Sequence, residues 1–488
     1  MVQTTTGAGA TVTPSTEGLW SPRHRTLTLG LVLTITLVAF EALAVATIMP
    51  IVARDLGDIQ LYGWVFAAFF LGNLLGIVVV GGMIDRGGLV VPFVTGLALF
   101  SVGLIGGGLA PSMGILVGAR FVQGLGAGAI PPIAYVSIGR ALPESLRPRM
   151  FATLSTAWVL PGVIGPALSG TVAELFHWRL VFLGLLPIIL LAGVMTLPGL
   201  RRLPGSEAEL ESSARRSRDR LIPAVFVTIG AGLLLAGLGG EVSLLAVAEL
   251  GVGIVFALPA FRALTPPGTL RVRRGLPAAV LLRGLLTMMF FCADAYVPLA
   301  LQDWRGVPAG ISGIALTAAT LSWTGGAWIQ AHQIEDLGPR RFVTIGFLTT
   351  GLGVLGFAAV LSPSIPVAVG VVAWALAGLG MGLSYSPLSL VVLAEAAPEE
   401  QGAATSGLQL SDVLGTAFGT GIGGAFVAAG HRLGWEGWVG LAGAFGIAVA
   451  VAAIGALLSS RLPDARVRPA SEPERVGGAS PAPTGSEP

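Results

Sequence analysis

Residues 113–138 read MGILVGARFVQGLGAGAIPPIAYVSI and contain a single charged side chain, Arg120. A helix needs about 20 consecutive apolar residues to cross the hydrocarbon core of a bilayer, so this stretch predicts a membrane-spanning helix. An arginine inside such a helix is costly unless it is paired or faces water. Arg120 is therefore expected to have a function; the alternative is a structural role, in which it pairs with a carboxylate and holds the helices together.

The rest of the chain repeats this apolar pattern. Of its 488 residues, 53% are hydrophobic and 11% are charged, whereas about a quarter of the residues in a soluble domain are charged. The charges collect in short clusters between long apolar runs, which argues against a soluble enzyme and predicts an all-α polytopic membrane protein. The fourteen predicted spans cover residues 27–50, 61–83, 90–110, 113–138, 150–172, 178–197, 221–239, 242–261, 277–301, 309–332, 342–361, 366–393, 401–429 and 436–460.

The arginines test this count, because the cytoplasmic loops of membrane proteins carry an excess of basic residues. All 28 basic residues are arginines, and Arg120 and Arg283 fall within spans. If the N-terminus is cytoplasmic, 22 of the others lie on the cytoplasmic side. The four on the outer side are Arg54, Arg179, Arg305 and Arg432. We therefore expect a multi-pass protein of the bacterial plasma membrane with both termini in the cytoplasm.

The spans group as six, two and six, and two related six-helix halves are the usual build of secondary transporters. A weak repeat supports this grouping, because ALPE at 141–144 and AAPE at 396–399 precede corresponding spans. The expected divisions are a cytoplasmic tail (1–26), a first six-helix bundle (27–200), a cytoplasmic loop (201–220), two accessory helices (221–261), a cytoplasmic linker (262–275), a second six-helix bundle (276–460) and a disordered tail (461–488).

Two further motifs have a physical interpretation of their own, and a third feature is a spacing in the first span. The sequence GGMIDRGG at 81–88 suits a tight turn between two helices, because glycine adopts backbone conformations that other residues avoid. The sequence PGVIGPALSG at 161–170 places glycine and proline inside a span, which predicts a bent helix that packs closely. In the first span, Glu41 lies nine residues before Pro50.

Together with RFVQG at 120–124, these motifs resemble the major facilitator superfamily, and specifically the fourteen-helix branch of its drug:proton antiporters. The resemblance runs from about residue 27 to residue 460. Two features depart from the family pattern: Glu41 stands where an aspartate is usual, and the loop after Gly88 lacks the usual basic pair. The residues that the resemblance implies in conformational change are Gly81, Asp85, Arg86, Gly165, Pro166, Gly170, Glu335, Arg340 and Arg341.

Asp85 and Glu335 occupy matching positions in the two halves, each beside a cytoplasmic helix end. A helix N-terminus attracts negative charge. We expect Asp85 to latch the cytoplasmic side of the outward-facing state by binding the N-terminus of the penultimate span.

Four ionisable side chains lie deep within the predicted spans: Glu41, Arg120, Asp294 and Asp412. At 1.5 Å per residue, Glu41 lies roughly 13 Å from the outer boundary, and Arg120 and Asp294 each lie roughly 10 Å from it. Asp412 lies roughly 16 Å from the inner end of its span. Burial disfavours the charged form of a carboxylate and a nearby arginine favours it, so protonation can follow conformation.

These four residues are the expected proton-coupling groups, with fixed ion pairs between helices as the alternative. Arg283 lies near the inner end of its span and is expected to extend its charge to the membrane surface. The central cavity is expected to include aromatic and amide side chains, which in membrane helices also serve packing and interface belts. The expected cavity residues are Gln123, Trp158, Phe290, Tyr296, Trp323 and Gln409.

The leading functional hypothesis is proton-coupled export of hydrophobic small molecules, cationic ones included, by alternating access. The expected partners are that substrate, protons and membrane lipids, with no nucleic acid, no cofactor and no metal, and the protein is expected to act as a monomer. A lipid or lipid-like metabolite is the alternative substrate. A membrane-embedded enzyme is disfavoured because the four histidines are scattered, and a sensor is disfavoured because no long soluble signalling domain is present.

The topology predicts that Ser212, in the 201–220 loop, is closed to reagents applied outside the cell. A Ser212→Cys variant in intact cells should not react with a membrane-impermeant maleimide, and it should react after the cells are opened. Labelling from outside the intact cells would contradict the topology.

Overall fold

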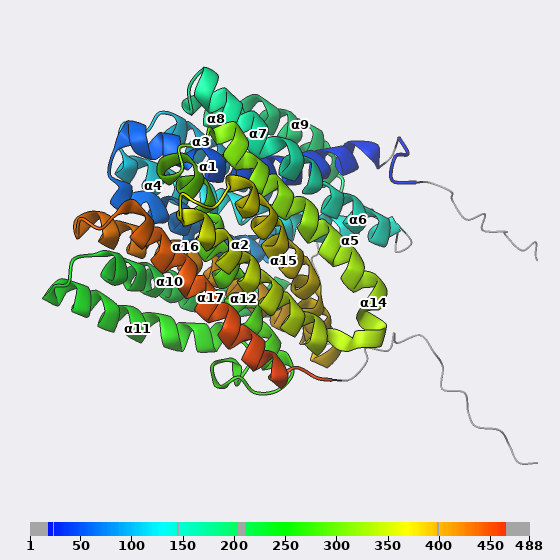
Figure 1. Cartoon of the computed structure of the whole chain (residues 1–488). Coiled ribbons are helices and arrows are strands. Elements are labelled where there is room, and N and C mark those ends of the chain that lie inside the picture. The colour runs from blue at the N-terminus through cyan, green and yellow to red at the C-terminus, as the bar shows by residue number, and fades with distance from the viewer. Residues whose placement is uncertain (1–17, 23, 144–145, 204–209, 398–399, 465–488) are drawn as a thin grey trace, which may run out of the picture.

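The computed structural model describes residues 18–22, 24–143, 146–203, 210–397 and 400–464, and of some residues within helices, Asp85 and Arg86 among them, only the backbone. The described chain is helical and contains no strand. The α-helices are α1 (Arg25–Leu56), α2 (Tyr62–Gly87), α3 (Val90–Gly108), α4 (Met113–Ala127), α5 (Ile130–Ala141), α6 (Arg147–Thr156), α7 (Val159–Leu175), α8 (Arg179–Leu183), α9 (Leu186–Arg201), α10 (Leu210–Gly239), α11 (Leu244–Leu264), α12 (Leu276–Asp294), α13 (Val297–Leu299), α14 (Ala309–Ala358), α15 (Val367–Glu395), α16 (Gln401–Arg432) and α17 (Gly437–Leu458). Figure 1 shows them packed as one bundle of long helices.

Twelve helices of the described chain are long and apolar enough to cross a membrane. One of them contains α14, which joins two predicted spans across a kink at Gly338, where φ is 75° and Pro339 follows. The fifth predicted span is divided between α6 and α7, and α7 is apolar but has only 17 residues. The membrane-protein class is confirmed, while the count of fourteen spans stays a prediction.

The helices α10 and α11 pack side by side at one edge of the bundle (Figure 1). α10 also packs against α2 and α16, so it covers the place where the first and second groups of six helices meet. Leu71 of α2, Ala231 of α10 and Leu414 of α16 belong to one buried apolar cluster. At the far end of α10, Arg432 donates hydrogen bonds to the carbonyl oxygens of Gly239 and Gly240, the latter at 2.9 Å.

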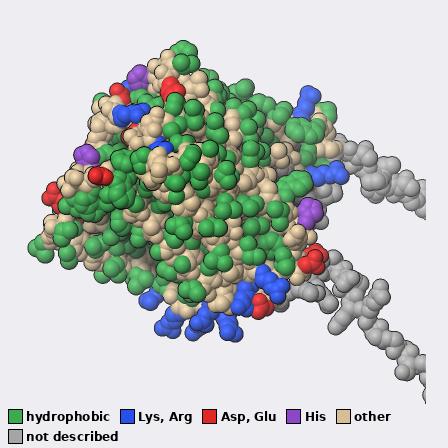
Figure 2. Space-filling model, viewed as in Figure 1, with side chains coloured by type: hydrophobic (Ala, Val, Ile, Leu, Met, Phe, Trp, Pro, Cys, Tyr) green, Lys and Arg blue, Asp and Glu red, His purple; other side chains and the backbone are tan. Residues whose placement is uncertain are grey.

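Charged side chains are confined to the two ends of the bundle in the view of Figure 2, and arginines gather along its lower edge. That distribution agrees with a membrane-spanning bundle; the orientation of the termini stays a prediction. Of the predicted tails at 1–26 and 461–488, residues 1–17, 23 and 465–488 lie outside the described residues.

The structure describes the side chains of the predicted conformational residues between helices in the second half, but not all of those in the first half. The side chains of Asp85 and Arg86, and residue Glu399 at the proposed partner helix, lie outside the described part, so the latch stays a prediction. In the second half, Glu335 and Arg341 are exposed, whereas Arg340 forms an ion pair of 2.5 Å with Asp464.

Glycines allow α2 and α4 to approach each other along their backbones. A Cβ atom added to Gly124 would collide with the carbonyl oxygen of Phe69, and one added to Gly72 would collide with that of Phe121. Small residues promote this close packing in membranes, where helix association relies on van der Waals contact. The approach places Arg120 of α4 against α2.

We predict that Gly124→Leu destabilises the protein, because the added side chain forces α4 away from α2 and overpacking commonly costs about 1–3 kcal/mol. Gly118→Leu, on the same helix, is the matched control, since nothing lies within 4 Å of its Cβ position. Thermal denaturation of the purified variants in detergent should show a lower transition for the Gly124 variant only. Equal transitions would contradict the packing role.

Candidate functional site

Glu41 of α1 and Arg120 of α4 form a buried ion pair between Oε1 of the carboxylate and Nη1 of the guanidinium. Both side chains are almost fully buried, with 1% and 3% of their surface exposed, respectively. Arg120 also donates hydrogen bonds to Oε1 of Gln123 at 2.6 Å and to the carbonyl oxygen of Val65 at 3.3 Å. Its guanidinium carbon lies 4.3 Å from the centre of the Phe69 ring, an arrangement that favours a cation.

The carboxylate of this pair is only partly satisfied. Oε2 of Glu41 and Nε2 of Gln123 are buried and make no hydrogen bond of standard geometry among the described residues, although the Gln123 side chain interacts with the Glu41 carboxylate. A buried polar atom without a partner costs free energy, so functional sites are where such atoms are most readily explained. Protonation of Glu41 would remove part of this cost by neutralising the carboxylate.

A second buried pair joins Arg283 of α12 and Asp412 of α16, whose Nε and Oδ1 atoms lie 3.1 Å apart. The expectation that Arg283 reaches the membrane surface is wrong, because the side chain is 7% exposed and points to Asp412. Tyr385 of α15 donates a hydrogen bond of 3.0 Å to Oδ2 of Asp412, and its ring lies 3.2 Å from the guanidinium carbon. The pair was missed because sequence depth alone does not reveal which carboxylate a neighbouring helix offers.

Asp294, at the end of α12, has no ion-pair partner among the described side chains. It interacts with the indole of the buried Trp374, whose nitrogen makes no hydrogen bond of standard geometry. The expected carboxylates therefore lie at three separate places in the structure, in two kinds of setting. Glu41 and Asp412 are each paired with an arginine, and Asp294 lies beside an aromatic ring.

A series of aromatic rings connects the surroundings of Asp294 with those of Asp412 within the second half. Phe290 stacks on Trp374 with ring centres 5.2 Å apart and meets the edge of Trp323 at 5.6 Å. Trp323 in turn lies 5.5 Å from Tyr385. Tyr385 and Trp374 were not anticipated from the sequence, and no spacing rule would have selected them among the chain's aromatic residues.

The other expected cavity residues are dispersed. Gln123 is fully buried in the Glu41 pair, and Tyr296 is buried where the two halves meet. Trp158 is 49% exposed just before α7, and Gln409 is half-buried on α16. Of the six expected cavity residues, the structure brings Phe290 and Trp323 into ring contact.

On the side that is outer in the predicted topology, polar contacts join the two halves. Arg54 of α1 pairs with Asp303 at 2.9 Å, and Gln302 donates to the carbonyl oxygen of Thr47 at 2.8 Å. Tyr62 of α2 packs on Tyr296 with ring centres 5.6 Å apart and donates to Ala295. We call these contacts the outer seam.

The glycine and proline motif of α7 extends this seam. Gly170 packs against the backbone of Ala309, and Pro166 packs against Gly313, both at the start of α14. Gly165 lies beside the ring of Phe40 on α1, at 3.5 Å from its Cβ position. Gly81 has nothing within 4 Å of its Cβ position. The α7 motif therefore lies at a contact between halves.

Comparison with known proteins assigns this architecture. The family model of the Major Facilitator Superfamily matches residues 30–333 and 279–486. The chain belongs to the Major Facilitator Superfamily. One relative, a probable multidrug-efflux transporter of Mycobacterium tuberculosis, is 29% identical over 437 residues, which cover 86% of this chain and 91% of the relative.

Other relatives and solved structures extend the likeness. The multidrug transporter protein MdtP of Bacillus subtilis is 27% identical over 417 residues, covering 83% of this chain and 75% of that protein. The fold is similar to that of the transporter PepTSo, with a TM-score of 0.66, 16% identity, and coverage of 89% of this chain and 98% of that one. It is also similar to an inward-facing bacterial homologue of the human lysosomal transporter Spinster, with a TM-score of 0.65, 16% identity, and coverage of 90% and 98%.

We predict that Asp412→Asn destabilises this superfamily member, because it leaves the charge of Arg283 buried without a carboxylate. Breaking a buried ion pair on one side costs about 3–5 kcal/mol. The double variant Arg283→Met/Asp412→Leu should recover much of the loss, since it removes both charges.

The matched control is Asp303→Asn, which breaks an ion pair whose side chains are 55% and 32% exposed. Exposed pairs contribute about 0–1 kcal/mol, so this variant should denature close to the wild type. Thermal denaturation of the purified proteins measures all three. A double variant as unstable as Asp412→Asn would show that the cost is not that of an unpaired charge.

Proposed function

We propose that the protein exports hydrophobic small molecules in exchange for protons, by alternating access across the cell membrane. The observation that carries this proposal is the buried Glu41–Arg120 pair, which joins two helices and leaves one carboxylate oxygen without a hydrogen bond of standard geometry among the described residues. The relatives named as multidrug-efflux and multidrug transporters, each matched over most of its length, support the substrate class.

The conformation supports alternating access. The outer seam holds the two halves together through α1, α2 and α7, whereas Tyr135 of α5 and Trp158, toward the opposite end, are each 49% exposed. Closed contacts on one side with accessible aromatic rings on the other favour an inward-facing state. The outer seam would then be the set of contacts that breaks when the site opens outward.

Glu41 couples this change to protons. While it is ionised, Glu41 needs Arg120, because an isolated charge at this depth costs several kcal/mol. When outward opening separates α1 from α4, Glu41 takes up a proton from outside and becomes neutral. Return to the inward-facing state restores Arg120 beside it and favours release of the proton to the cytoplasm.

Arg120 has other partners during the protonated phase. The oxygen of Gln123, the carbonyl oxygen of Val65 and the ring of Phe69 all face its guanidinium. These neutral groups let the arginine stay charged while Glu41 is neutral. Gln123 therefore contributes as a positioning residue for Arg120.

The aromatic series of the second half supports binding of flat or cationic hydrophobic substrates. Trp323 is half-buried and offers a ring surface, Phe290 is buried behind it, and Asp412 lies at the end of the series beside Tyr385. A cation over an aromatic ring gains about 0.5–2 kcal/mol. Asp294 and Asp412 are the next candidates for proton coupling after Glu41.

We predict that Glu41→Gln abolishes uphill transport driven by a pH gradient, because the amide copies the protonated acid and cannot release a proton. Exchange of substrate at equilibrium should persist, and Glu41→Asp should keep partial activity since it retains the charge at shorter reach. Proteoliposomes with an imposed pH gradient and a fluorescent hydrophobic cation measure both.

Glu249→Gln is the control, because it removes a carboxylate from α11, outside the pair. It should transport as the wild type does. Full gradient-driven transport by Glu41→Gln would show that the coupled proton binds to another carboxylate. Loss of substrate exchange as well as of uphill transport would indicate a structural role for the pair.

A further inference from the structure

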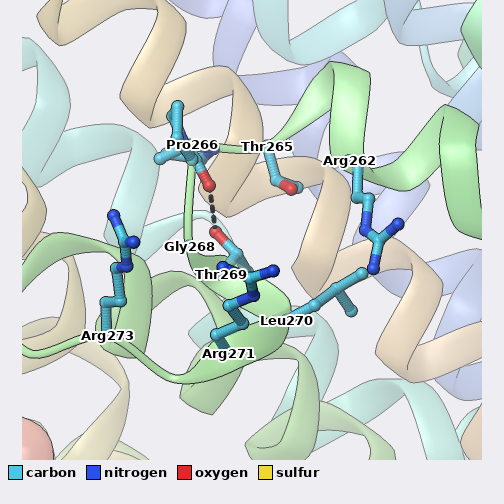
Figure 3. Close-up of a pocket in the computed structure, with 9 residues that line it drawn as sticks. Arg262, Thr265, Pro266, Gly268, Thr269, Leu270, Arg271 and Arg273 are labelled. Atoms are coloured by element: carbon cyan, nitrogen blue, oxygen red, sulfur yellow. Dashed lines mark hydrogen bonds between the residues drawn. The ribbon is translucent and has the colours of Figure 1, made fainter.

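The linker between α11 and α12 forms a basic pocket of about 400 Å³. Arg262, Arg271 and Arg273 line it together with Thr265, Pro266 and Leu270. Figure 3 shows Arg262 at the end of α11 and Arg271 and Arg273 on the linker, around one hollow. Among the described side chains, none of these three arginines forms an ion pair. An unneutralised basic hollow of this kind is complementary to an anion.

The linker that carries the arginines has a defined conformation. Thr269 donates from its hydroxyl to the carbonyl oxygen of Pro266 at 2.7 Å, a bond drawn in Figure 3. Arg273 donates from its backbone to Gly268 at 3.2 Å, and its aliphatic stem packs over Gly268, where a Cβ atom would collide with it. Gly268 has φ of 97°, a left-handed conformation that favours glycine. The pocket is therefore preformed.

An apolar groove of about 270 Å³ adjoins the basic pocket, and Leu270 lines both. The groove runs between α11, with Leu258 and Phe261, and α12, with Leu285 and Met288. Its lining is apolar except at Ser411 of α16. A basic pocket at the end of a span with an apolar groove beside it has the shape and chemistry of one amphiphile.

We propose that this pocket and groove bind an anionic phospholipid, with its phosphate group among Arg262, Arg271 and Arg273 and an acyl chain between α11 and α12. Basic pockets between helices on the cytoplasmic side bind anionic headgroups, and the arginine distribution places this linker on that side. The acyl chain packs beside Gly284 and Ser411, which neighbour Arg283 and Asp412 in sequence. The lipid thus fixes the accessory pair to the second bundle next to its buried ion pair.

The test is native mass spectrometry of the full-length, delipidated protein titrated with phosphatidylglycerol and, separately, with phosphatidylcholine of the same acyl chains. The wild type should bind phosphatidylglycerol at least about tenfold more tightly, because arginines near the headgroup attract its net negative charge. Arg262→Gln/Arg271→Gln/Arg273→Gln should remove that preference.

The matched control is Arg149→Gln/Arg201→Gln/Arg202→Gln, which removes three exposed arginines predicted to lie on the same face. It should keep the full preference for phosphatidylglycerol. Leu258→Trp keeps every arginine and fills the groove, so it should weaken phosphatidylglycerol binding about fivefold or more through loss of acyl contacts. This second variant decides the matter if the triple variant does not fold.

Three results would overturn the proposal. Equal binding of the two lipids by the wild type would show that the pocket does not select anionic headgroups. An equal loss of the phosphatidylglycerol preference in the control triple variant would show that the preference comes from the general charge of the surface. Displacement of phosphatidylglycerol by millimolar inorganic phosphate, with Leu258→Trp unaffected, would identify a site for a free anion.

Discussion

The ion pair between Glu41 and Arg120 is the interaction on which the rest of the bundle depends. The charge of Glu41 is not stable between apolar helices without Arg120, so α1 and α4 must meet wherever Glu41 is ionised. The glycines of α2 and α4 fix the position of Arg120 for this contact, because they let α4 approach Val65 and Phe69 of α2. A proton on Glu41 removes the need for this contact, so a single proton changes which helices are held together.

The outer seam and the buried pairs therefore both affect the equilibrium between the inward-facing and outward-facing states. The seam combines an exposed ion pair between Arg54 and Asp303, which water can replace at little cost, with buried hydrogen bonds from Gln302 and Tyr62. The pairs are dry, so their rupture is expensive unless a proton neutralises the acid. A cycle in which protonation weakens the deep contact and water replaces the shallow one needs no other source of free energy than the proton gradient.

The sequence was enough to predict the membrane class, the family and the pairing of Glu41 with Arg120, because a lone charge in an apolar span demands a partner and few were available. It failed for Arg283, since depth in a span does not tell which face of the helix the side chain occupies. Tyr385 and Trp374 were missed for the same reason: an aromatic residue in a span has no spacing signal that separates a site from packing. The roles of Asp85 and Arg86 stay predictions, because their side chains lie outside the described part.

The two buried pairs are not equivalent, and their difference indicates which acid is the better carrier of the proton. Asp412 is 19% exposed and receives a hydrogen bond from Tyr385, so water and a hydroxyl help it to stay charged when Arg283 moves. Glu41 is 1% exposed, and no hydroxyl group donates a hydrogen bond to it among the described residues. Its charge therefore depends on Arg120 to a much greater extent. An acid whose charge depends on one movable partner converts helix motion into proton uptake most directly, which places Glu41 ahead of Asp412 in the coupling reaction.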